Sequence, residues 1–126
     1  GIGDVNLIKV SSMLGPNTEL IPLPKLKPGA MVNCVLSEVT SKKKGNIINA
    51  SVAVAIGDRL GCVVETTGIN DKEDGIKEEA INMVKYMMNK RNVEIKDLIV
   101  ETSTHTVENK GSVIASVVYI NDDIIE

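Results

Sequence analysis

The chain has 126 residues, of which 43% are apolar and 25% are charged, and its formal net charge is −3. This length and composition predict one domain with a real hydrophobic core and exclude a disordered protein. The lack of Trp and Phe and the absence of a basic excess exclude a nucleic-acid partner. No apolar run in the sequence reaches membrane-spanning length, so we expect no membrane partner.

The residue types that most often bind metals or act as nucleophiles are scarce. Cys34 and Cys62 stand far apart without a CxxC pair, which is typical of a protein of the reducing cytoplasm. His105 is the sole histidine, so we expect no metal site, and most catalytic triads are excluded as well. Any chemistry must therefore use carboxylates, hydroxyls or a group that the chain makes from itself.

The first half of the chain predicts strands separated by a proline-rich loop. Residues 4–10 alternate as a strand does, and residues 15–29 hold too many Pro and Gly for a helix or a central strand. Apolar residues among these prolines predict a packed extended loop; they are Ile21, Leu23 and Leu26. Residues 30–40 and 47–56 read as two strands of a hairpin, whose polar tip contains a solvated run of three lysines.

The second half predicts one helix among further strands. Residues 60–67 form a short buried strand, and a helix follows over residues 75–90. Its apolar stripe is made of Ile76, Ala80, Met83, Val84 and Met87, and we interpret its methionines, Met88 included, as core-filling residues. Residues 94–106 and 112–120 are strands joined by a turn at 109–111. The order β-β-β-β-α-β-β predicts a single α+β domain over residues 1–126, with mostly antiparallel pairing.

Three features of the sequence are candidates for chemistry, although each has an ordinary structural explanation. The Ser11-Ser12 pair follows a strand, where serines commonly form turns. Glu65 is expected to be buried at a strand end, where desolvation raises the pKa of a carboxyl and makes it a proton donor. Many such carboxylates only hold structure together, and His105 within its strand is more typical of a structural histidine.

Together, these segments resemble one known family. Residues 1–12, from Gly1 to Ser12, resemble the processing segment of the pyruvoyl-dependent arginine decarboxylases, and residues 21–26 and 28–30 resemble the loop that follows it. Residues 51–56 and 105–108 also resemble that family, in the same order and over nearly the whole chain. The family implies a fold of the αββα sandwich type, in which the 75–90 helix covers an antiparallel sheet and the long loops add to a second layer.

The resemblance implies a cofactor made from the chain itself. The Ser12 hydroxyl attacks the Ser11 carbonyl to give an ester, and elimination then cuts the chain and leaves a dehydroalanine that hydrolyses to a ketone. Ser12 thus becomes a covalent pyruvoyl group at the start of an α chain (residues 12–126), and residues 1–11 become a separate β chain. Such a group acts as the electron sink that amino acid decarboxylation requires.

The resemblance also assigns roles to other residues. It implies that Asn6 assists processing by donating its amide to the carbonyl under attack. It implies that Glu65 returns a proton to the substrate carbon after CO2 leaves, and that the backbone of Gly3 and Val5 lines the substrate pocket. Six residues of straight strand separate Asn6 from Ser12 by about 20 Å. The chain must therefore bend, or a neighbouring subunit of the homotrimer that the family forms must bring the two together.

The leading interpretation is a self-processing, cytoplasmic decarboxylase that converts arginine to agmatine and CO2 in polyamine biosynthesis. In this family an acidic residue that faces the guanidinium lies in a segment ahead of Gly1. The chain also departs from the family at Gly15-Pro16 and over residues 33–39. A pyruvoyl-dependent decarboxylase of another amino acid and an unprocessed, non-catalytic trimeric domain of the same fold therefore stay open as alternatives.

Overall fold

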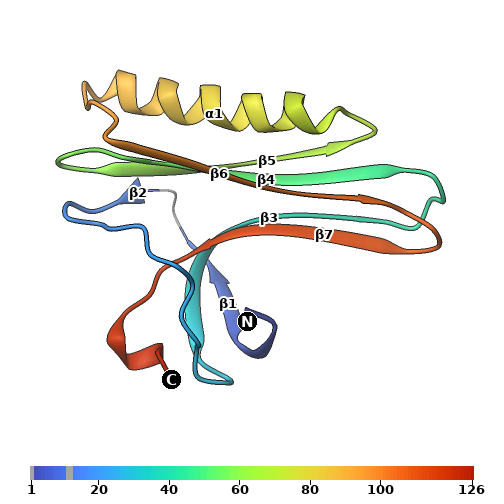
Figure 1. The fold of residues 1–126 in the computed structure, drawn as a ribbon, viewed down its shortest axis with the longest axis horizontal. Coiled ribbons are helices and arrows are strands. Elements are labelled where there is room, and N and C mark those ends of the chain that lie inside the picture. The colour runs from blue at the N-terminus through green and yellow to red at the C-terminus, as the bar shows by residue number, and fades with distance from the viewer. Residues whose placement is uncertain (1, 11–12) are drawn as a thin grey trace.

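The computed structural model describes residues 2–10 and 13–126, which form two β-sheets and one α-helix (Figure 1). Two 3-10 turns, η1 and η2, lie near the ends of the chain. In chain order the elements are η1 (Ile2–Asp4), β1 (Asn6–Lys9), β2 (Met13–Leu14), β3 (Met31–Ser41), β4 (Ile47–Ile56), β5 (Gly61–Ile69), α1 (Glu73–Lys90), β6 (Asp97–Thr106), β7 (Gly111–Val118) and η2 (Asp122–Ile124). The predicted α+β class is confirmed.

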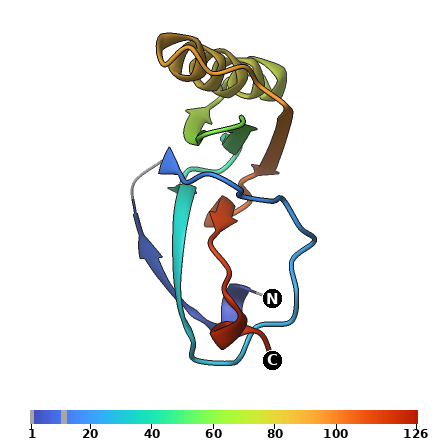
Figure 2. The ribbon, with the colours of Figure 1, turned by 90° about the vertical axis from the view of Figure 1, so that its left-hand side faces the viewer.

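The two sheets stack to form the middle and one outer layer of the fold. The outer sheet has the strand order β1-β3-β7, and the inner sheet has the order β2-β5-β4-β6. All pairings are antiparallel except that of β1 with β3, which run parallel. Helix α1 lies on the face of the inner sheet that is turned away from the outer sheet (Figures 1 and 2). The order of layers is therefore helix, inner sheet and outer sheet.

The burial of each strand follows from this layering. Eight consecutive residues of β4 are buried because the helix covers one face of the inner sheet and the outer sheet covers the other. Strand β3 of the outer sheet instead alternates between buried and exposed residues over much of its length. One part of the core, around Ala53, Val64 and Val84, lies under the helix, and the rest lies between the sheets, around Val35, Val52 and Val63.

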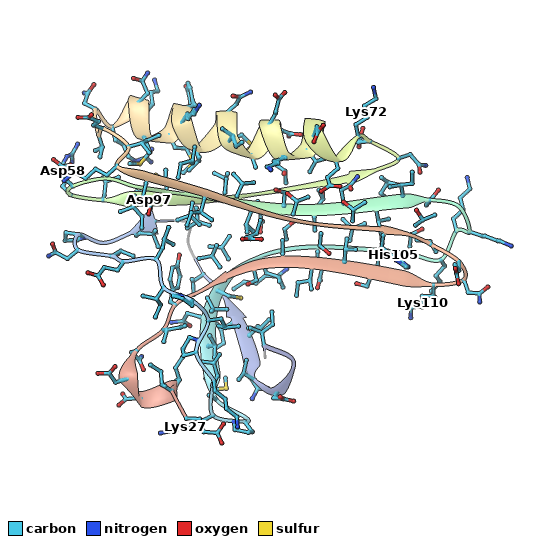
Figure 3. All side chains as sticks on the ribbon, viewed as in Figure 1. Lys27, Asp58, Lys72, Asp97, His105 and Lys110 are labelled. Atoms are coloured by element: carbon cyan, nitrogen blue, oxygen red, sulfur yellow. The ribbon has the colours of Figure 1, made fainter. Side chains whose placement is uncertain are left out.

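The helix follows the predicted stripe but begins two residues earlier, at Glu73. Ile76, Ala80, Val84 and Met88 are its buried residues. Glu73 and Asp74 lie in its first turn and Lys90 in its last, as the helix dipole favours. Charged side chains on the periphery, such as those of Lys72 and Lys110, point away from the layers (Figure 3).

The predicted hairpin of residues 30–40 and 47–56 is wrong. β3 belongs to the outer sheet and β4 to the inner sheet, so the lysine-rich turn at 42–46 crosses from one sheet to the other. Gly45 in this turn has a φ of 88°, and its N–H donates to the carbonyl of Val107. The turn at residues 107–110 makes the same crossing from β6 to β7. The alternation of apolar and polar residues within a strand does not show whether the next strand pairs with it in a hairpin or crosses to the other sheet. In both cases one face of the strand is buried.

The N-terminal region also differs from the prediction. The expected strand over residues 4–10 is reduced to Asn6–Lys9, preceded by the turn η1, and the two-residue strand β2 was not predicted. In the proline-rich loop Leu26 is buried and pairs with Ile125, whereas Ile21 and Leu23 are exposed. The loop is therefore packed at Leu26 and at Leu20, which contacts the core between the sheets.

Candidate active site

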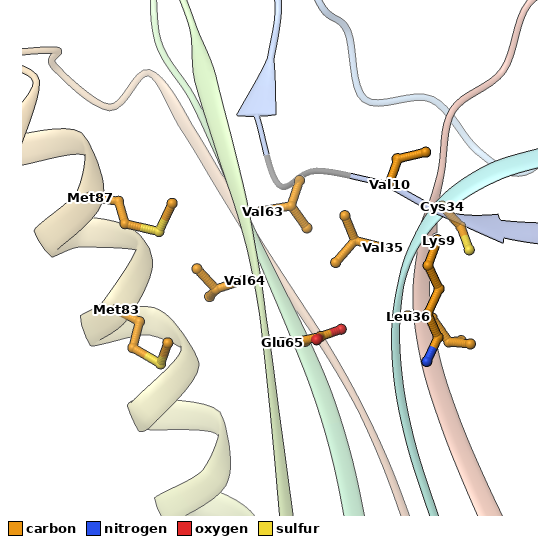
Figure 4. A pocket seen from close by; sticks show the side chains of 10 residues that line it. All are labelled: Lys9, Val10, Cys34, Val35, Leu36, Val63, Val64, Glu65, Met83 and Met87. Carbon is orange, nitrogen blue, oxygen red and sulfur yellow. The ribbon is translucent and has the colours of Figure 1, made fainter.

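A cavity of about 540 Å³ lies beside the edge of the inner sheet where β5, β3, β1 and α1 approach one another (Figure 4). β5 pairs with β2 only at Gly61 and Cys62, so beyond these residues, within the described part of the chain, it has a ladder partner on one side alone. The walls of the cavity are mostly apolar. Its lining residues are Lys9, Val10, Cys34, Val35, Leu36, Val63, Val64, Glu65, Met83 and Met87.

Glu65 supplies the carboxylate of this cavity. It lies in the middle of β5, with its side chain on the same side of the strand as Val63, which packs between the sheets. Figure 4 shows its carboxyl pointing toward β3. The prediction that Glu65 is buried at a strand end is wrong for the single chain, because the side chain is exposed and the strand continues to Ile69.

The Ser11-Ser12 pair lies outside the described residues, but both of its neighbours are placed. Val10 precedes it and lines the same cavity as Glu65. The Val10 N–H donates to the Cys34 carbonyl at 3.0 Å, which holds this end of β1 on β3. Met13 follows the pair and is joined to β5 through β2, opposite Cys62. Val10 is thus held at the outer sheet and Met13 at the inner sheet.

The other predicted site residues do not join this cavity within one chain. Asn6 begins β1, at the end away from Val10, and its side-chain amide donates to the Gly29 carbonyl at 3.0 Å. Gly3 lies in η1, and Val5 lies between η1 and β1. Four residues of strand separate Asn6 from Val10 by about 13 Å. A single chain thus brings Glu65, but not Asn6, Gly3 or Val5, close to Val10, the residue that precedes the Ser11-Ser12 pair.

Most of the cavity wall could not be predicted from the sequence. Lys9 and Cys34 are ladder partners in the parallel pair of β1 and β3, which the sequence did not predict. Of the two methionines expected in the core, Met87 does pack against the core under the helix, whereas Met83 is 42% exposed, and both line the cavity. Their spacing of four residues, beside the buried stripe, was the available signal that they form a second surface of the helix.

Burial alters the acidity of two groups near this region. It raises the pKa of the Cys62 thiol above its ordinary value of 9.0, and the nearby Arg91 opposes this shift. Burial likewise raises the pKa of Tyr119, with a further upward contribution from Cys34. Both groups are therefore neutral at physiological pH.

The described residues contain no cluster of three or more His, Cys, Asp or Glu side chains that could hold a metal ion. Cys34 and Cys62 are free and buried. Within residues 2–10 and 13–126, no helix is long and apolar enough to cross a membrane.

The chain matches a known protein family along almost its whole length. The family model described as pyruvoyl-dependent arginine decarboxylase (PvlArgDC) matches residues 1–123. The chain belongs to this family. A pyruvoyl-dependent arginine decarboxylase of Methanothermobacter thermautotrophicus is 52% identical over 121 residues, which cover 96% of this chain and 80% of that protein. Another, of Methanocaldococcus jannaschii, is 34% identical over 119 residues, covering 92% of this chain and 72% of that one.

A solved structure shares the fold of this PvlArgDC family member. The structure of a pyruvoyl-dependent histidine decarboxylase at pH 8 matches with a TM-score of 0.55 and 16% sequence identity. The match covers 75% of this chain, which spans about half (52%) of the length of that chain. The two sheets and helix of this PvlArgDC chain are thus an arrangement also found in another pyruvoyl-dependent decarboxylase.

The residues of this chain fit the family's pyruvoyl group. The group requires a serine as precursor, and in the sequence the Ser11-Ser12 pair is flanked by Val10 and Met13, both of which the structure holds in place. The adjoining cavity offers one carboxylate, from Glu65, within walls formed largely by valine, leucine and methionine side chains. The cavity therefore combines largely apolar walls with one acidic residue, Glu65, and one basic residue, Lys9.

Proposed function

We propose that this protein is a self-processing decarboxylase that converts L-arginine to agmatine and CO2, with Ser12 as the precursor of its pyruvoyl group. The observation that carries the proposal is the cavity shared by Glu65 and Val10 in a chain that belongs to the PvlArgDC family. It connects the acid of the site to the segment in which the family's cleavage site lies. The relatives named as arginine decarboxylases support arginine as the substrate.

The pyruvoyl group, once formed, supplies an electron sink for the electrons that CO2 leaves behind. The other parts of the reaction fall to the chain. Apolar side chains of Val35, Val63 and Met87 exclude water from the substrate carboxylate, and a poorly solvated carboxylate is easier to lose as CO2. Glu65 then delivers a proton to the substrate carbon, for which its carboxyl must carry that proton when CO2 departs.

A homotrimer would complete this site. Glu65 is exposed in the single chain, and Asn6, Gly3 and Val5 lie away from its cavity, at the far end of β1. A neighbouring subunit that presents its own N-terminal residues at this cavity would cover Glu65 and bring Asn6 toward Ser11. In this arrangement Asn6 donates its amide to the carbonyl that Ser12 attacks, and the backbone of Gly3 and Val5 lines the substrate pocket.

Two measurements on the purified protein test the proposal. Intact mass under denaturing conditions should show separate species that end at Ser11 and begin at residue 12. Release of CO2 should be measured with arginine and with a panel of ornithine, lysine and histidine. If the cleaved protein acts on another member of the panel and not on arginine, that amino acid replaces arginine as the proposed substrate. A protein that stays intact and inactive would show a non-catalytic domain.

A further inference from the structure

Ser37 forms a hydrogen bond that joins the two sheets next to the cavity. It lies on β3 of the outer sheet, only 1% of its surface is exposed, and its Oγ donates to the Thr66 carbonyl oxygen at 2.7 Å. Thr66 is on β5 of the inner sheet, so this bond crosses the sandwich. Its loss would leave a buried carbonyl without this partner, which destabilises the contact between the sheets.

Thr66 is held from its other side as well. Its side chain is turned toward the helix, and its Oγ1 donates to the Ile76 carbonyl at 2.9 Å. Thr66 is 6% exposed, so both of its bonds are shielded from water. One residue of β5 is therefore fixed to the outer sheet through its carbonyl and to α1 through its hydroxyl.

Glu65 directly precedes this doubly held residue. On the cavity side β5 has no ladder partner beyond Cys62 among the described residues, so the ladder with β4 alone would let this edge shift. The contacts between β3 and β5 beside Glu65 are otherwise made by apolar side chains such as Val35 and Val63, which pack without fixing a direction. The Ser37 bond supplies the directional constraint.

We propose that Ser37 and Thr66 are positioning residues that hold the Glu65 carboxyl at a fixed place relative to the Val10 end of β1. The inference rests on the proposed function, since it assigns Glu65 the proton delivery. A displacement of about 1 Å can cost on the order of 100-fold in rate, so a loosened β5 edge lowers turnover without removing any reacting group. The pair acts only through Glu65 and does not touch the substrate.

The main test compares kcat for arginine in Ser37→Ala and in Thr66→Val, each normalised to the cleaved fraction from intact mass. We expect both variants to self-cleave and kcat to fall by roughly 10- to 100-fold, because the acid is misplaced. Thr66→Ser keeps the hydroxyl that bonds to Ile76 and should retain nearly the wild-type kcat. The matched control is Ser41→Ala, which removes a buried serine hydroxyl of the same strand, bonded to the 42–46 turn.

A double-mutant cycle distinguishes positioning from general damage. If Ser37 acts through Glu65, adding Ser37→Ala to Glu65→Gln should lower kcat little further, because the misplaced group is already absent. A multiplicative loss in the double variant would overturn the proposal. So would a loss in Ser41→Ala equal to that in Ser37→Ala, or an unchanged kcat in Ser37→Ala.

Amide hydrogen exchange tests the structural link without any substrate. Exchange at residues 64–67 should be faster in Ser37→Ala than in wild type and unchanged in Ser41→Ala. Equal exchange in Ser37→Ala and wild type would overturn the inference. If wild type releases no CO2 from arginine, the proposed substrate fails by itself. The cycle is then run with the amino acid of the panel that the protein decarboxylates, and a cleaved protein inactive on the whole panel would overturn the positioning role too.

Discussion

The inner sheet and the outer sheet differ in how completely the chain covers them. The inner sheet lies between α1 and the outer sheet, and its strand β4 is buried along eight consecutive residues. The outer sheet leaves one face uncovered in the single chain, and Ile8, Met31 and Ile114 are exposed on its strands. Glu65, the acid that we propose for proton delivery, lies where the two sheets meet. A fold can therefore be complete in its core while the site that we propose still needs a neighbouring subunit.

The largest effect should come from a change at the Ser11-Ser12 pair. Ser12→Ala lacks the hydroxyl that attacks Ser11, so we expect an uncleaved chain with no decarboxylase activity. The helix-covered inner sheet should be unaffected, and the melting temperature should stay close to that of the wild type. Intact mass and thermal denaturation measure the two results. Cleavage of Ser12→Ala at the wild-type rate would contradict the assignment of Ser12.

Glu65→Gln should separate processing from turnover. Gln has nearly the size of Glu but no acidic proton, so the loss of general acid catalysis should lower kcat by roughly 10²–10⁴. Self-cleavage should proceed as in wild type, because it needs the Ser12 hydroxyl and a polarised Ser11 carbonyl. Intact mass and CO2 release check both results. A variant that does not cleave would move Glu65 into processing and would require a new role for Asn6.

A matched pair of isoleucines tests the difference between the sheets directly. Ile48 on β4 is fully buried, whereas Ile114 on β7 is 42% exposed. Ile48→Ala should lower the free energy of unfolding by about 2–5 kcal/mol, because it leaves a cavity between the sheets. Ile114→Ala should lower the stability of the isolated chain by at most about 0.5 kcal/mol. Chemical denaturation measures both, and equal losses would show that the outer sheet is covered as fully as the inner one.

The smallest expected effect is a dependence of stability on high pH. The pKa of Cys62 is raised above 9.0 by burial in the folded protein, so the unfolded chain loses this proton first. The stabilisation is therefore fully present below about pH 9 and is lost as the pH rises through the folded pKa. Cys62→Ala should show a shallower loss of unfolding free energy between about pH 9 and pH 11. An identical slope in both proteins would exclude this contribution.

Much of the fold could be predicted because burial patterns are local. The stripe of α1 and the continuous apolar run of β4 each follow from the side of the element that is covered. The assignment of β3 and β4 to different sheets could not be predicted, because the turn between them has the composition of a hairpin tip. β2 was missed because two residues carry no periodicity, and the exposure of Glu65 depends on a strand edge that no local pattern marks.

The site was predictable only in part, for a related reason. The importance of Ser12 and Glu65 was indicated by resemblance, and membership in the family supports it. Cys34 lines the cavity because β1 and β3 pair in parallel, and Met83 lines it from the side of α1, next to the buried stripe. Both are tertiary features, and neither residue type signals them. Ser37 reads in the sequence as an ordinary polar residue within a strand, and only its partner on β5 makes it notable.

The connection between β1 and β2 has a consequence for the cleaved protein. The proposed cut after Ser11 would leave β1 without a covalent link to residue 12. β1 would then be a peptide ligand of β3, retained by bonds such as Asn6 N–H to the Ala30 carbonyl at 2.8 Å and Gly29 N–H to the Asp4 carbonyl at 2.7 Å. The fraction of β chain that stays bound would then be set by its dissociation constant and by the protein concentration. The mature protein would accordingly be a complex whose smaller component can be exchanged, and isotope-labelled β chain added in excess would replace it at a rate set by dissociation.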